Sequence, residues 1–123
     1  MVETLLVERF TELGDGLIAA FEQAGFPFST AFWLKEEGDW TLVVGTPLYD
    51  KGPQQAYVRL VEALRNAPAS LQSLPVRLEG NRSPMTKDLR RLFAKTAAVR
   101  GMRLGGHSIG GKWVEDAYTL RIR

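Results

Sequence analysis

The residues best suited to acid–base chemistry lie near the C-terminus. His107 is the only histidine of the 123-residue chain, and Asp116 and Tyr118 follow it in the last segment. Histidine can act as a general base near neutral pH, a carboxylate can orient it, and a cation such as Arg103 or Lys112 can stabilise a developing anion. A metal-independent nuclease would use such groups. The alternative is a structural histidine, with Asp116 paired to Arg103 or to backbone donors.

A second candidate site is a cluster of cations in one predicted helix. Lys87, Arg91 and Lys95 are four residues apart and therefore share a helix face, and Arg90 lies beside them. Within this helix only Asp88 is placed to neutralise the cluster. Such a stripe could contact a phosphate backbone, and the alternative is an ordinary solvated face. The candidate residues for nucleic-acid binding are Arg82, Lys87, Arg90, Arg91, Lys95 and Arg100.

The sequence offers little for thiol, metal or phosphate-loop chemistry. The chain has no cysteine, which excludes disulfides and zinc sites with sulfur ligands. Three acids, Glu36, Glu37 and Asp39, cluster in a predicted turn, where exposed acids are common. Five glycines between residues 101 and 111 match neither the phosphate-binding loop nor the dinucleotide fingerprint. We therefore expect no metal ion and no cofactor, and the absence of a catalytic signature favours a non-enzymatic protein.

The charge is divided unevenly along the chain. Residues 1–76 hold five basic and ten acidic side chains, a net charge of −5, whereas residues 77–123 hold eleven and four, a net charge of +7. The overall net charge of +2 therefore conceals a polar molecule. The basic C-terminal part would suit a polyanionic or acidic partner.

Length and composition predict one globular domain spanning residues 1–123. Hydrophobic residues make up 45% of the chain, which is enough for a core. Charged residues interrupt the apolar N-terminal segment, so we expect no signal peptide. No run approaches the roughly 20 apolar residues that cross a bilayer. We expect a cytoplasmic protein with no membrane partner.

Three segments have the apolar periodicity of helices. The first covers residues 2–24, the second begins near Pro53, and the third begins at Pro84 with Ser83 as its N-cap. Gly14 could weaken the first helix. The predicted core stripe of the second helix consists of Tyr57, Leu60, Val61 and Leu64. The predicted core residues of the third helix are Met85, Leu89, Leu92 and Phe93.

Five segments are expected to be strands. Residues 30–37 and 40–48 flank a turn at Gly38–Asp39, residues 75–78 form a short strand, and the last segment folds back at Gly110–Gly111. The predicted order is therefore α-β-β-α-β-α-β-β. Hairpins at both ends predict an α+β fold, with a five-stranded, mainly antiparallel sheet and three helices mostly on one face.

A sheet that is covered on one face leaves its other face open. If Phe32 and Leu34 face the helices, Trp33 points to the opposite side, because side chains alternate along a strand. Val43 and Trp113 would join it there. Such an apolar patch would mark a partner or self-association surface, unless a helix or loop covers it. The interface candidates are Trp33, Val43 and Trp113.

Several short motifs resemble those of small bacterial proteins of uncharacterised function. The motifs are Ala31-Phe-Trp-Leu34, Trp40-Thr-Leu-Val-Val44, Thr46-Pro-Leu48, Lys51-Gly-Pro53, Ala56-Tyr57 and the ending Val114-Glu-Asp-Ala-Tyr118. The resemblance covers most of the chain and implies a bacterial, cytoplasmic setting. It implies no catalytic residue, cofactor or activity.

These observations support three functional hypotheses. The first is a non-enzymatic interaction module that self-associates or binds a partner protein through the open sheet face. The second is nucleic-acid binding through the basic helix, and the third is a nuclease-type enzyme that uses His107. The first two hypotheses are compatible with each other, because a dimer would double the basic surface.

Overall fold

The computed structural model describes residues 2–94 and 101–122, including the side chains of residues 8–94, 101–106 and 108–122. These residues form a mixed α and β structure, which confirms the broad class that the sequence predicts. The elements are α1 (Val2–Ala24), β1 (Thr30–Glu36), β2 (Asp39–Thr46), α2 (Pro47–Lys51), α3 (Pro53–Leu64), α4 (Ala69–Gln72), β3 (Val76–Gly80), α5 (Pro84–Leu92), β4 (His107–Ile109), β5 (Lys112–Val114) and β6 (Asp116–Ile122).

The main sheet has four strands in the order β3-β2-β1-β6, and β4 and β5 form a separate two-stranded sheet. Strand β1 is antiparallel to both of its neighbours, whereas β2 and β3 are parallel. The predicted five-stranded sheet is wrong, because the chain bends at Glu115 and divides the last expected strand in two. Its first half pairs with β4 and its second half pairs with β1.

Both predicted hairpins form. In the first hairpin, Glu36 pairs with Asp39, so Glu37 and Gly38 make the turn, both with positive φ as in a type I′ turn. The turn lies one residue earlier than the sequence suggested. In the second hairpin, β4 and β5 have the expected register, with Ile109 opposite Lys112.

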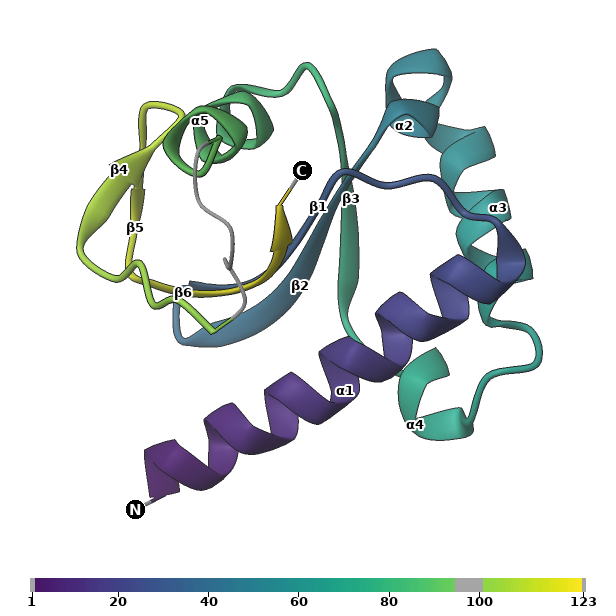
Figure 1. The fold of residues 1–123 in the computed structure, drawn as a ribbon, viewed down its shortest axis with the longest axis horizontal. Coiled ribbons are helices and arrows are strands. Elements are labelled where there is room, and N and C mark those ends of the chain that lie inside the picture. Colours follow the sequence, from purple (N-terminus) through teal and green to yellow (C-terminus); the bar gives the residue numbers. More distant parts are fainter. Residues whose placement is uncertain (1, 95–100, 123) are drawn as a thin grey trace.

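Helices cover both faces of the sheet (Figure 1). Helices α1 and α3 lie on one face, and α5 with the β4–β5 hairpin covers the other. Two of the three predicted helices, found as α1 and α3, therefore share one face as predicted, whereas the expectation that the other face stays open is wrong. The physical reason is that β1 and β2 are apolar on both sides, so each face needs its own cover. One core includes Trp33, Leu42, Val44, Leu78 and Leu120. The other includes Phe32, Leu34, Val43, Leu89 and Val114.

Helix α1 continues without a break through Gly14. A Cβ at this position would overlap Cδ1 of Leu120 on β6, so glycine lets the helix lie close against the sheet. No helix in the described part of the chain is both long enough and apolar enough to cross a bilayer.

The second and third predicted helices, which are α3 and α5 in the structure, begin at the predicted residues. Pro53 is the first residue of α3, and the Ser83 hydroxyl caps α5 by accepting a hydrogen bond from the Thr86 amide at 3.2 Å. Their core faces differ in part from the prediction. The expected core residues that lie exposed instead are Tyr57, Val61 and Leu92. Helix α3 buries Ala56, Leu60 and Leu64, and α5 buries Met85, Thr86 and Leu89.

Candidate functional site

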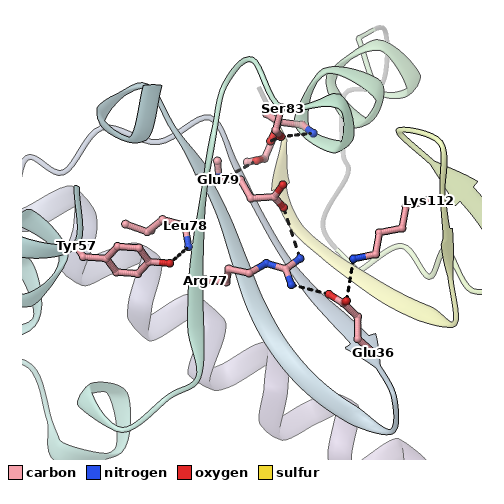
Figure 2. Close-up of polar contacts among 10 residues, drawn as sticks. Glu36, Tyr57, Arg77, Leu78, Glu79, Ser83 and Lys112 are labelled. Carbon is pink, nitrogen blue, oxygen red and sulfur yellow. Dashed lines mark hydrogen bonds and ion pairs between the residues drawn. The ribbon is translucent and has the colours of Figure 1, made fainter. Parts of the chain in front are cut away.

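A chain of alternating charges joins the β4–β5 hairpin to the main sheet (Figure 2). Glu36 at the end of β1 accepts from Lys112 Nζ at 2.9 Å and from Arg77 Nη1 at 2.7 Å. Arg77 Nη2 also lies 3.7 Å from Oε2 of Glu79. The Lys112 hydrogen bond, followed by the contact with Arg77, holds the pKa of Glu36 below its ordinary value against the opposing effect of desolvation. The two anions and two cations balance, so this cluster is best explained as an attachment point for the hairpin.

A second carboxylate attaches the turn of this hairpin to α5. One oxygen of Asp88 accepts from the Gly110 amide at 2.9 Å, and its other oxygen accepts from the Arg91 guanidinium. The Gly110 hydrogen bond, with the Arg91 contact second, lowers the pKa of Asp88. Asp88 therefore uses both oxygens in contacts within the protein, and Arg91 is partly neutralised.

The acidic member of the predicted acid–base site has partners of its own. Asp116 Oδ2 accepts from Arg103 Nη2 at 2.8 Å, and its Oδ1 accepts from the Ala117 amide at 2.9 Å. The alternative pairing of Asp116 with Arg103 is therefore confirmed. Tyr118 is partly buried against the α1 side of the sheet. The backbone of His107 belongs to β4, while its side chain lies outside the described residues, so its catalytic role stays a prediction.

The described cations of the basic helix lie on the surface. Lys87, Arg90 and Arg91 are exposed on α5, and Arg82 is exposed just before it. The other two candidates, Lys95 and Arg100, lie outside the described residues. A hollow of about 370 Å³ lies alongside the contact between the helix and the hairpin turn. Its lining consists of Pro84, Lys87, Asp88, Arg91, Gly110 and Gly111.

The predicted interface patch of three residues does not form. Trp33 is only 1% exposed on the α1 side, where its Nε1 donates to the Phe10 carbonyl at 2.8 Å. Val43 is 0% exposed and belongs to the core on the opposite face. Only Trp113, at 67% exposed, reaches solvent. The prediction of one open face is wrong, because α5 and the hairpin cover the side that it left bare.

An apolar hollow that the sequence did not reveal lies beside α3. We call it the α3 groove; its volume is about 440 Å³. Its lining consists of Tyr57, Leu60, Val61, Leu64, Arg65, Gln72, Leu74 and Val76. The Tyr57 hydroxyl accepts from the Leu78 amide at 3.1 Å and so satisfies one donor on the free edge of β3 (Figure 2). Sequence periodicity predicts that Tyr57 and Val61 belong to the core, so it does not reveal that both line a groove.

The uneven charge along the sequence is partly neutralised inside the fold. Ion pairs join Glu22 to Arg121 at 2.8 Å, and Glu36 to Arg77 and Lys112. Each of these pairs links an acid of the N-terminal part to a cation of the C-terminal part. By contrast, no carboxylate in the described part of the structure pairs with Lys87.

No protein-family model, curated protein or solved structure matches this chain. Among the described residues, no group of three or more histidine, cysteine or acidic side chains is arranged to hold a metal ion. The two candidate binding surfaces of the chain are therefore the α3 groove and the basic face of α5.

Proposed function

We propose that the protein is a non-enzymatic interaction module that binds a second copy of itself through the α3 groove. The observation that carries this proposal is the position of Val61. It is 66% exposed, yet it lies in the middle of an apolar helical stripe and on the wall of a hollow of about 440 Å³. Exposed apolar groups beside a concave apolar surface are typical of interaction sites.

The shape of this surface favours a second copy as the occupant. Val58 and Val61 protrude from α3, while Leu74 and Val76 line the hollow next to the helix. A twofold axis brings the same patch of both subunits together, so a protrusion and a hollow on one patch can fill each other reciprocally. Each copy would thereby cover the exposed apolar groups of the other.

The charges on α3 also suit self-association. No carboxylate in the described structure pairs with Arg65, and Glu62 reaches Arg59 only at 4.0 Å. In two antiparallel copies of α3, Glu62 of each subunit could approach Arg65 of the other. Exposed charges of this kind favour one orientation more than they add affinity.

Sedimentation velocity over a range of concentrations tests the proposal. We expect the wild-type protein to change from monomer to dimer as its concentration rises. Val61→Asp should prevent dimer formation, because each interface would then bury an unpaired carboxylate. Leu92→Asp is the matched control, since Leu92 is exposed on α5, away from the groove.

The outcome distinguishes self-association from its absence. A wild-type protein that stays monomeric up to about 1 mM would contradict the proposal, because weaker dimers would contribute less than about 4 kcal/mol. Equal dimerisation by wild type and Val61→Asp would show that the proteins associate through another surface. Circular dichroism of each variant checks that its fold is retained.

A further inference from the structure

The outer side of α5 and of the neighbouring hairpin is rich in cations. Lys87, Arg90 and Arg91 are exposed on α5, and Lys87 and Arg91 line the hollow next to the hairpin turn. Between residues 82 and 103 the sequence contains seven cations and one carboxylate, Asp88. Helix α5 and helix α3, which carries the α3 groove, lie on opposite faces of the four-stranded sheet (Figure 1).

The single carboxylate of α5, Asp88, partly neutralises Arg91 and holds the hairpin, but it does not pair with Lys87. One oxygen of Asp88 accepts a hydrogen bond from the Gly110 amide and the other accepts from Arg91, so both are occupied within the fold. Lys87 has no carboxylate partner in the described part of the chain. The positive charge of Lys87 is therefore available to an anionic partner.

The hairpin next to α5 carries an exposed indole ring, that of Trp113. Trp113 points away from the core, because its neighbour Val114 is buried and side chains alternate along β5. Gly111 lines the hollow, and Trp113 follows it by two residues. The Cα atoms of these two residues therefore lie within about 7 Å of each other. Proteins that bind single-stranded nucleic acid combine exposed aromatic rings, on which bases stack, with cations that contact the phosphates.

We infer that this basic–aromatic surface, formed by Lys87, Arg90, Arg91 and Trp113, binds single-stranded nucleic acid. The cations would contact successive phosphates, and a base would stack on Trp113. A duplex fits less well, because its bases already stack on each other and leave the indole without a partner. An anionic membrane also fits less well, because interfacial binding needs a broad apolar face, whereas α5 exposes only Leu92 among its large apolar side chains.

Fluorescence anisotropy with labelled oligo(dT) and oligo(U) of about 12 nucleotides tests this inference. Three phosphate contacts should give a log–log salt slope of about −2. Lys87→Gln/Arg90→Gln should weaken binding at low salt by at least about tenfold and bring the slope closer to zero. Trp113→Ala should weaken binding by about tenfold without changing the slope, because stacking releases no counterions. Trp113→Phe should restore part of the affinity.

The matched control is Arg9→Gln/Arg59→Gln, which removes two exposed charges from α1 and α3, the helices on the other face of the sheet from α5. It should leave the affinity nearly unchanged. Absence of binding at about 100 µM protein in low salt would overturn the inference. Equal losses in the control variant, tighter binding to a duplex of the same length, or binding to anionic phosphatidylserine vesicles without binding to oligonucleotides would also overturn it.

Discussion

At Gly110, the backbone conformation and the packing both require glycine. Its φ is +62°, and a Cβ there would lie 2.5 Å from the Met85 amide nitrogen of α5. The same residue donates the hydrogen bond to Asp88 that fixes the hairpin turn. Any side chain at this position would therefore strain the turn and also push it away from the helix.

We predict that Gly110→Ala lowers the free energy of unfolding by about 2–4 kcal/mol. This loss is the sum of the cost of a left-handed backbone at alanine and the cost of the clash between its Cβ and the α5 backbone. Gly111→Ala is the control, because Gly111 has φ +80° but has open space where its Cβ would be. It should lose only about 1–2 kcal/mol. Urea unfolding measures both values, and equal losses would show that contact with α5 is unimportant.

At the scale of elements, two carboxylates attach the β4–β5 hairpin to the remainder of the fold. Asp88 holds its turn to α5, and Glu36 holds Lys112 to the main sheet. Both carboxylates have pKa values below their ordinary range in the folded protein. The folded state therefore binds fewer protons than the unfolded state at pH values around these pKa values.

The resulting stability should be lost in acid. The contribution is complete above the unfolded pKa of about 4 and disappears as the pH falls through the lower folded values. We predict that the free energy of unfolding decreases from about pH 5 to about pH 3, and that Asp88→Asn/Glu36→Gln makes this decrease smaller. Glu37→Gln, which changes an exposed carboxylate outside both contacts, should leave the decrease as it is. Urea unfolding over this pH range would contradict the prediction if the double variant and wild type fell in parallel.

Local elements could be predicted from the sequence more fully than their surroundings. The Ser83 cap, the helix from Val2 and the Gly110–Gly111 turn depend on residues close together in the chain, and all are found in the structure. Which face each strand turns to which helix depends on distant segments. Because β1 and β2 are apolar on both sides, alternation could not place Trp33 and Val43 on opposite, covered faces.

The candidate sites also differ in how far the sequence predicts them, because some depend on local spacing and others on contacts between distant segments. The cations of α5 follow from helical spacing alone, and the structure places Lys87, Arg90 and Arg91 on the surface. The α3 groove needs β3 and α4 beside the helix, so the apolar spacing of Val61 could not reveal that it is exposed. The Glu36 cluster joins residues 41 and 76 positions apart, for which no local pattern exists.

At the scale of the whole molecule, the sheet keeps the two proposed surfaces apart. Helix α3, which carries the groove, and helix α5, which carries the cations of the basic–aromatic surface, lie on opposite faces of the four-stranded sheet (Figure 1). Since each adjoining layer adds about 10 Å, the surfaces are separated by about 20 Å. A dimer formed through α3 would therefore carry two basic–aromatic surfaces that face away from each other.

This separation predicts that the two activities are independent. Val61→Asp should become monomeric yet bind an oligonucleotide of about 12 nucleotides with unchanged affinity per subunit, because a short strand reaches one surface only. Lys87→Gln/Arg90→Gln should lose that affinity while its dimer dissociation constant stays the same. Anisotropy and sedimentation velocity on both variants provide the four measurements.

A loss of oligonucleotide affinity beyond about threefold in Val61→Asp would mean that the surfaces are coupled, since independent sites add without interaction. The second subunit would then have to contribute to the nucleic-acid site.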